Sequence, residues 1–438
     1  MSSTSDKTTL SSTVQHPEKD RSWLKSYIPL FIGEAFSILG SVLVQFAIVW
    51  WLTDTTGSAT TLASGSIAII VPGALLGPFL GTLVDRLDRR WVLVITDTII
   101  SLGTIFLIIM FWLERVEIWH IFVVFGISSI FGSLQWSAMQ AVTSTIVPEE
   151  HLQRMQGLVT MVQSGITIGA PPLGALLLSI LPIYQILSLD VITAVIAVSL
   201  IWIIKIPKII QTNEKVVSPQ NMWMDFKEGF SFMTHYRGML YMVLAFALMN
   251  MILEPMFTFF PLYITDYFGL GALELGFIST SWGGGMLLGG LLMSVWGGFQ
   301  KKMNTIYLGN ILFSIFAAMI AAARSDMFWF ALAGVLLMAF SNALTNAPIM
   351  AILQSKVPKH MQGRIFSLVQ SMVSISVPIS LLISGPIADK YGVHLFYWVG
   401  AIGMALISLL MLIKPIRTIE DQEVDERYLQ DEMVAVPE

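Results

Sequence analysis

The chain lacks cysteine and is poor in charge. None of its 438 residues is cysteine, which excludes disulfide bonds and thiolate metal sites. Only 12% of the residues are charged, whereas 55% are hydrophobic; a soluble domain usually carries about 25% charged residues. The apolar residues occur in blocks long enough to cross a bilayer, which takes about 20 residues per helix. The composition therefore predicts an all-α integral membrane protein with many spans.

Residue groups that carry catalysis are missing as well. The sequence has no Gly-x-x-x-x-Gly-Lys-Ser/Thr loop, the phosphate-binding motif of many ATPases, and no cluster of acidic, basic or metal-ligating residues at one membrane face. The histidines lie at span ends or in loops without the spacing of a metal site: His16, His120, His151, His235, His360 and His394. We expect no enzymatic activity, no cofactor, no bound metal and no nucleic acid partner.

Twelve apolar spans divide the chain into two halves. In the first half hydropathy places them at about 27–51, 60–84, 91–112, 118–143, 153–180 and 184–206. In the second half it places them at about 238–265, 272–298, 303–323, 327–350, 362–387 and 393–414. The halves, 27–206 and 238–414, are predicted six-helix bundles. Two tails flank them, a polar one at 1–26 without a signal-peptide core and an acidic one at 415–438.

The segment 207–237 joins the two halves. Within it Trp223, Phe226, Phe230 and Met233 recur at helical spacing, which fits an amphipathic helix on the inner leaflet. A partly buried linker helix fits the same pattern, so the sequence leaves both interpretations open.

Basic residues predict the orientation, because cytoplasmic loops carry an excess of Lys and Arg. With both termini placed in the cytoplasm, 21 of the 24 Lys and Arg residues fall on that side, and only Arg115, Arg324 and Lys390 fall outside. None lies deep inside a span. We therefore expect both termini to be cytoplasmic.

Two short segments repeat between the halves at an offset of 210 residues. VPEEHLQRMQGLV begins at Val147 and VPKHMQGRIFSLV begins at Val357, so that Arg154 and Arg364 coincide. Such repeats are typical of transporters built from two homologous bundles.

A dense cluster of charge, GTLVDRLDRR, separates the second and third spans. Its spacing resembles the signature loop Gly-x-x-x-Asp-Arg/Lys-x-Gly-Arg-Arg/Lys of the major facilitator superfamily. The matching residues are Gly81, Asp85, Arg86, Arg89 and Arg90. Asp88 replaces the usual glycine, and Asp tolerates a left-handed turn position better than most residues. A plain positive-inside loop is the alternative interpretation.

The resemblance to this superfamily covers about residues 27–414. Within it the chain looks like the macrolide-efflux branch of bacterial drug exporters, a likeness carried by the segments 33–59, 77–90, 206–208, 225–229 and 363–393. The resemblance implies two six-helix bundles around a central cavity and proton-driven export of amphipathic compounds across the bacterial cytoplasmic membrane.

The same resemblance implies roles at the cytoplasmic side. In similar proteins Asp85 pairs with charges or helix ends across the bundle interface, and the arginines of the loop bind acidic partners or lipid. Arg154 and Arg364 match a cytoplasmic gate position. We expect the protein to act as a monomer, with a small amphipathic substrate, protons and the lipid bilayer as its partners.

Four carboxyl groups lie within predicted spans: Glu34, Asp97, Asp190 and Glu254. A carboxylate inside a membrane is costly and usually faces the bundle interior or a water-filled cavity. Without a basic partner deep in any span, burial favours the neutral, protonated form, and proton coupling requires a carboxyl group that exchanges its proton. Glu254 ranks first because it precedes Pro255, which is expected to open the helix, and has Phe and Met neighbours. Neutral, purely structural carboxyl groups or helix caps are the alternative.

Span five resembles an antiporter motif, Gly-x-x-x-Gly-Pro-x-x-Gly-Gly, with a shift of one residue. The residues that carry it are Gly165, Gly169, Pro171, Pro172 and Gly174. Glycines four residues apart allow close helix approach and prolines bend the helix. The pattern favours export over uptake; ordinary small-residue packing is the alternative. The glycine-rich run from Trp282 to Gly290 in span eight is interpreted in the same way.

The sequence thus predicts a secondary transporter, a proton/drug antiporter that works by alternating access. The alternatives are an exporter of a dedicated metabolite or siderophore and a proton-coupled uptake symporter. The absence of buried Lys and Arg disfavours anionic substrates.

Overall fold

The computed structural model describes residues 22–84, 87–204, 227, 230–417 and 419–421, and these residues contain no strand. The first six helices are α1 (Ser22–Thr56), α2 (Ala59–Val84), α3 (Arg89–Trp112), α4 (Ile118–Ile146), α5 (Glu149–Ile180) and α6 (Ile183–Ile203). The later long helices are α8 (Arg237–Thr258), α10 (Ala272–Trp296), α11 (Lys302–Ala322), α12 (Phe328–Lys356), α13 (Lys359–Tyr391) and α14 (His394–Leu410). Short elements are α9 (Phe260–Leu262), the π-helix η1 (Tyr263–Tyr267), α15 (Lys414–Arg417) and the 3₁₀-helix η2 (Ile419–Asp421).

The predicted all-α membrane fold is confirmed. Among the described residues 11 helices are long and apolar enough to cross a bilayer, and α14 is an apolar helix of 17 residues at the position of the last predicted span. One predicted span is wrong in its extent: 238–265 is not a single helix, because α8 ends at Thr258 and α9 and η1 follow. Pro261 lies in this break and has no N–H to continue the ladder. Pro255, by contrast, lies inside α8.

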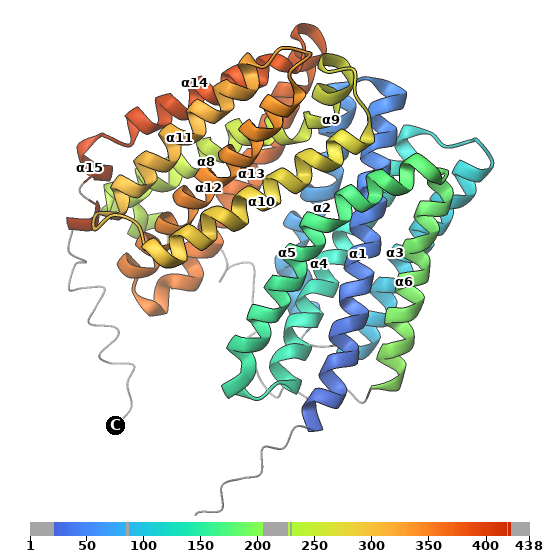
Figure 1. The fold of residues 1–438 in the computed structure, drawn as a ribbon. Helices are drawn as coiled ribbons and strands as arrows, with labels where there is room; N and C mark the ends of the chain where they lie inside the picture. The colour runs from blue at the N-terminus through green and yellow to red at the C-terminus, as the bar shows by residue number, and fades with distance from the viewer. Residues whose placement is uncertain (1–21, 85–86, 205–226, 228–229, 418, 422–438) are drawn as a thin grey trace, which may run out of the picture.

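The long helices form two bundles, α1 to α6 and α8 to α14, that meet at one end and diverge toward the other (Figure 1). Contacts between the bundles pair α2 with α13 and α5 with α10. A Cβ on Gly385 of α13 would lie 3.0 Å from the Cα of Thr60, and a Cβ on Gly276 of α10 would lie 2.9 Å from the Cα of Pro172. We call this the meeting end, where α2 and α10 begin and α5 and α13 end. The opposite end, where α1, α5 and α13 begin, is the diverging end.

The sequence repeat reappears in the backbone. Pro148 and Pro358 are the N-cap residues of α5 and α13, with φ, ψ of −58°, 145° and −53°, 143°. In each helix the N–H three residues later bonds to the proline carbonyl at 2.9 Å. Two helices that begin at equivalent positions and in the same conformation support the predicted pseudo-symmetry of the bundles.

Part of the joining segment lies outside the described residues, including Trp223 and Phe226, so the domain boundaries at 207 and 237 stay predictions. Near its end Phe230 is exposed, whereas Phe232 and Met233 are buried against the second bundle. This part of the segment therefore packs on the protein, as the partly buried linker interpretation expects.

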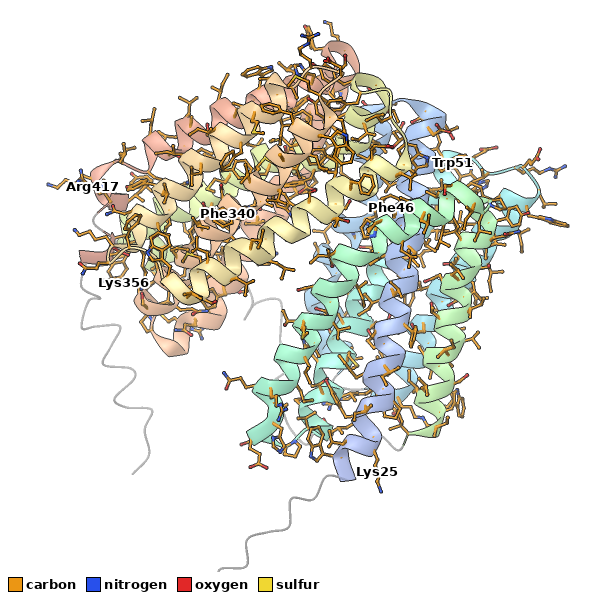
Figure 2. The ribbon with its side chains drawn as sticks, viewed as in Figure 1. Lys25, Phe46, Trp51, Phe340, Lys356 and Arg417 are labelled. Carbon is orange, nitrogen blue, oxygen red and sulfur yellow. The ribbon has the colours of Figure 1, made fainter. Side chains whose placement is uncertain are left out.

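Glycines of α10 let this helix pack closely against α12. Phe340, on the α12 side of the contact, is labelled in Figure 2. A Cβ on Gly289 would lie 2.5 Å from the carbonyl oxygen of Phe340 and 2.7 Å from the Cβ of Ala343. The next residue, Gly290, has no heavy atom within 4 Å of such a Cβ. The glycine-rich run therefore contains a packing position beside a position that faces open space.

We expect Gly289→Ala to destabilise the protein and Gly290→Ala to leave its stability unchanged or slightly raised. A methyl group at Gly289 meets backbone, which cannot move aside, and overpacking of this kind costs about 1–3 kcal/mol. At Gly290 alanine only restricts the unfolded chain, worth up to about 1 kcal/mol. The measurement is the thermal unfolding midpoint of both variants in the same detergent. Equal midpoints for the two variants would contradict the close packing of α10 against α12 at Gly289.

Candidate functional site

Two of the predicted carboxyl groups share one amide inside the first bundle. Asp97 of α3 accepts hydrogen bonds at Oδ1 from the Ser37 hydroxyl of α1 and from Nε2 of Gln135 on α4, both at 3.0 Å. The same Nε2 lies 3.4 Å from Oε2 of Glu34 on α1. Asp97 is 3% exposed. Gln135 therefore joins an acidic residue of α1 to one of α3.

This shared amide restricts how the pair can be charged. Like charges in a low-dielectric site repel each other strongly, and the hydrogen bonds to these two groups come from an amide and a hydroxyl, not from a cation. In addition, Oδ2 of Asp97 is buried without a partner, which is costly for an ionised carboxylate. These contacts disfavour a negative charge on both groups at the same time.

Asp190 of α6 is the third carboxyl group of this bundle. It accepts hydrogen bonds from the Ser41 hydroxyl of α1 at 3.0 Å and from the Thr104 hydroxyl of α3 at 2.8 Å. Gly40 allows this approach, because a Cβ there would lie 2.9 Å from the Cα of Asp190. Asp190 borders a cavity of about 200 Å³ that Ser128 of α4 also lines.

Four polar residues of α1 form a stripe along one face: Glu34, Ser37, Ser41 and Gln45. Their spacing of three and four residues places them on the same side of the helix. At one end of the stripe Glu34 borders a small cavity of about 30 Å³ between α1, α4 and α5. At the other end Gln45 borders the Asp190 cavity and also a second, larger cavity. We call these four residues the α1 polar stripe.

The larger cavity lies between the two bundles and measures about 320 Å³. Phe46 of α1, which Figure 2 places where the bundles meet, lines it. Phe257 and Trp282 from the second bundle also line it, with ring centroids 4.4 Å apart and nearly perpendicular planes. Its other polar groups are amide and hydroxyl side chains, and none of its lining residues is charged. We call it the interbundle cavity; it suits an apolar compound with a few hydrogen-bonding groups.

Glu254 lies apart from the other three carboxyl groups. It is on α8 in the second bundle and is half-buried. It is not among the residues that line the three cavities described here. The structure thus brings Glu34, Asp97 and Asp190 into one bundle and leaves Glu254 in the other.

The charged loop between α2 and α3 is described only in part. Gly81 lies in the last turn of α2, whereas Asp85 and Arg86 lie outside the described residues, and so does the predicted pairing of Asp85. Asp88 has φ of −67°, so a left-handed turn at this position is wrong. Asp88 instead caps α3, accepting a hydrogen bond from the backbone N–H of Arg90 at 3.1 Å.

The two arginines that follow bind helix ends of the first bundle. Arg89 donates to the carbonyl oxygen of Ala141 at 2.8 Å and to the Thr145 hydroxyl, both in the last turns of α4. Arg90 donates to the carbonyl oxygen of Trp202 in the last turn of α6 at 2.7 Å and stacks over its ring. Cations are favourable at helix C-termini, where carbonyl groups lack partners. These hydrogen bonds fix the start of α3 against α4 and α6.

The residues of the antiporter-like motif in α5 lie in two different surroundings. A Cβ on Gly165 or Gly169 would meet no heavy atom within 4 Å, so the expected close helix approach is not observed there. It is observed one turn later, where a Cβ on Gly174 would lie 3.0 Å from the Phe46 ring, and Pro171 lies against Gly276 of α10. The motif therefore spans the transition from open space to the contact between the bundles.

The predicted gate arginines lie at equivalent positions of the two bundles. Arg154 is exposed in the first turns of α5, and Arg364 is half-buried in the first turns of α13. Both are at the diverging end, where the bundles are separated (Figure 1). Their role as a gate stays a prediction.

The chain matches the family model of the Major Facilitator Superfamily over residues 30–381. The chain belongs to the major facilitator superfamily. It is a membrane transport protein, and the described part of the chain contains 11 helices that could span a membrane and one shorter apolar helix.

Two of the bacterial relatives are named for efflux or export. The chain is 31% identical to macrolide efflux protein A of Streptococcus pyogenes over 406 residues, which cover 92% of this chain and 99% of that protein. It is 25% identical to the putative bacilysin exporter BacE of Bacillus subtilis over 369 residues, 81% of this chain and 87% of that protein.

Solved structures support the same fold. A crystal structure of the nucleoside transporter NupG superposes with a TM-score of 0.69 at 11% identity, over 88% of this chain and 98% of that chain. A bacterial homologue of the iron transporter ferroportin gives a TM-score of 0.68 at 14% identity, over 89% of this chain and 98% of that chain.

Several polar residues of this superfamily member are missing from the sequence-based prediction. Gln135 and Thr104 are unremarkable as residue types, and only the fold shows that they bind carboxyl groups. The α1 polar stripe did leave a signal, since Ser37, Ser41 and Gln45 follow Glu34 at helical spacing in an apolar span.

Proposed function

We propose that this transporter exports an amphipathic, uncharged or cationic compound from the cytoplasm in exchange for protons, by alternating access of its two bundles. The observation that carries the proposal is the α1 polar stripe. It runs from the Glu34–Asp97 pair past Asp190 to Gln45, which borders the uncharged, aromatic interbundle cavity. One helix, α1, thus contacts the three carboxyl groups of the first bundle and also lines the interbundle cavity.

In this proposal the interbundle cavity binds the substrate and the carboxyl groups of the first bundle carry the proton. Glu34, Asp97 and Asp190 are the coupling residues, and Glu254 is a second candidate in the other bundle. In this proposal the protein binds either the substrate or the proton. After the substrate has left, a proton that enters from outside resets the carrier. A membrane-embedded carboxyl group is a functional candidate by default, since an idle one would be costly.

We infer that the diverging end faces the cytoplasm of a bacterial cell, across its cytoplasmic membrane. Lys25, Lys356 and Arg417 lie at the diverging ends of their bundles (Figure 2), and the Lys and Arg count of the loops favours the same side. Both termini are then cytoplasmic, and the arrangement in Figure 1 is open to the cytoplasm and closed to the outside. Asp85, Arg86, Arg154 and Arg364 are proposed to close the cytoplasmic side in the opposite state.

The similarity to macrolide efflux protein A supports macrolides as the first compounds to test. The similarity to a putative bacilysin exporter supports a second candidate, export of a dedicated small metabolite. Both functions use the same cavity and coupling residues and differ only in the substrate.

Accumulation assays in efflux-deficient bacteria test the proposed function. Cells that express the protein receive a panel of labelled macrolides, other drugs and small metabolites, each with and without a protonophore. We expect at least one compound to accumulate less in expressing cells, and the protonophore to abolish the difference. Raised accumulation driven by the proton gradient would contradict export and indicate an uptake symporter.

A further inference from the structure

Besides the packing of their helices, the two bundles are connected at the meeting end by the carboxylate of Asp389. Asp389 lies in the last turn of α13, and its oxygens accept three hydrogen bonds from the start of α2, 330 residues away in the chain. The backbone N–H of Ala59 lies 2.6 Å from Oδ1. The backbone N–H of Thr60 and the hydroxyl of Ser58 lie 3.2 Å and 3.1 Å from Oδ2.

These bonds complete the N-cap of α2 from the other bundle. The first N–H groups of a helix have no partner within the helix. The Ser58 hydroxyl accepts from the N–H of Thr61, as an N-cap serine normally does, and Asp389 accepts from the two N–H groups before it. The start of α2 is thus satisfied only in part by its own bundle.

The position of Asp389 is unfavourable for its own helix. A carboxylate in the last turn of α13 faces the negative end of that helix dipole, whereas the start of α2 offers the positive end of another. The helices are also in close contact one turn earlier, where a Cβ on Gly385 would lie 3.0 Å from the Cα of Thr60 and 3.2 Å from the Cβ of Ala63. Separating the bundles at this end leaves Asp389 beside the carbonyl groups of α13 and takes its carboxylate away from the N–H groups of Ala59 and Thr60.

We propose that Asp389 is a positioning residue of the transport cycle, a cap across the bundle interface that holds the meeting end closed. It stabilises the state in Figure 1 over the state open at the meeting end. This inference rests on the proposed alternating access, but on neither the substrate nor the coupling ion. Losing a cap of this kind changes the ratio of the two states by about fivefold.

Distance measurements between spin labels test the proposal, and the absence of cysteine leaves no background labelling. Arg115 and Ser325 are exposed in the loops before α4 and α12, one in each bundle at the meeting end. Labels on Arg115→Cys and Ser325→Cys report opening of that end. We expect Asp389→Ala to raise the ratio of long to short distances about fivefold over the parent protein. Asp389→Asn, which keeps one acceptor oxygen, is expected to raise it less.

Asp54→Ala is the matched control, because Asp54 is an exposed acid near the end of α1 at the same end of the molecule. It is expected to leave the distances unchanged. An unchanged distribution in Asp389→Ala, or an equal shift in Asp54→Ala, overturns the proposed cap.

The variant Gly385→Val distinguishes a failure of the proposed cap from a failure of alternating access. A side chain there must push α13 away from Thr60 and Ala63 whatever Asp389 does, so it opens the meeting end if an open state exists. Opening in Gly385→Val without opening in Asp389→Ala rejects the cap alone. Short distances in both variants, under all conditions, reject alternating access and the cap with it.

Discussion

Replacing Asp97 with asparagine is expected to reduce proton-driven efflux by at least about tenfold, toward the level of cells that lack the protein. Asparagine has the same size and keeps an acceptor oxygen for Ser37 and Gln135, so the packing of α1, α3 and α4 is retained. Its amide neither binds nor releases a proton in the physiological range. We therefore expect the variant to fold normally and to lose proton coupling. The measurement is the initial efflux rate of an exported compound, normalised to the amount of folded protein in the membrane.

Glu254→Gln is the matched comparison for Asp97→Asn. Glu254 is also an acid within a long apolar helix, but it lies on α8 in the second bundle and outside the α1 polar stripe. We expect Glu254→Gln to keep most of the efflux. The reverse result, loss in Glu254→Gln with normal efflux in Asp97→Asn, would move the coupling site to the second bundle.

Trp282→Ala is expected to weaken substrate binding by about 10- to 30-fold, or about 1.4–2 kcal/mol. Trp282 lines the interbundle cavity and packs edge-on against Phe257, so its loss removes apolar contact area and one partner of an aromatic pair. Equilibrium binding of the exported compound to purified protein measures the effect. The pH dependence of transport should stay unchanged, because the carboxyl groups of the first bundle are untouched.

Trp112→Ala controls for the general loss of a tryptophan. Trp112 is 68% exposed at the end of α3 and lines none of the three cavities. We expect unchanged binding in this variant. If both variants bind the compound as the parent protein does, the substrate does not occupy the interbundle cavity.

The spans were predictable because each follows from a local property, the mean apolarity of about 20 consecutive residues. The predicted 60–84 and 91–112 differ from α2 and α3 by no more than two residues at either end. The break after Thr258 was missed, since hydropathy stays high through Phe259 and Phe260 while the backbone changes at Pro261. Apolarity places a chain in the membrane but does not say where a helix ends within it.

The candidate site was predictable in its residue types and not in its grouping. Glu34, Asp97 and Asp190 stand out as acids in apolar spans, yet nothing local shows that Asp97 and Asp190 accept hydrogen bonds from Ser37 and Ser41 of α1. Glu254 had stronger sequence signals, a proline and aromatic neighbours, but these describe its own helix only. Asp389 shows the same limit, because its partners on α2 lie 330 residues earlier in the chain.

Proton exchange by the purified protein in liposomes tests the central proposal most directly. Liposomes are loaded with an uncharged exported compound and a pH indicator dye and then diluted into medium without the compound. With the parent protein, the compound that leaves should drive protons inward and acidify the interior, and Asp97→Asn should show no acidification. Alkalinisation of the interior would indicate symport, and release of the compound without any change in pH would indicate an uncoupled carrier; either result would contradict proton antiport.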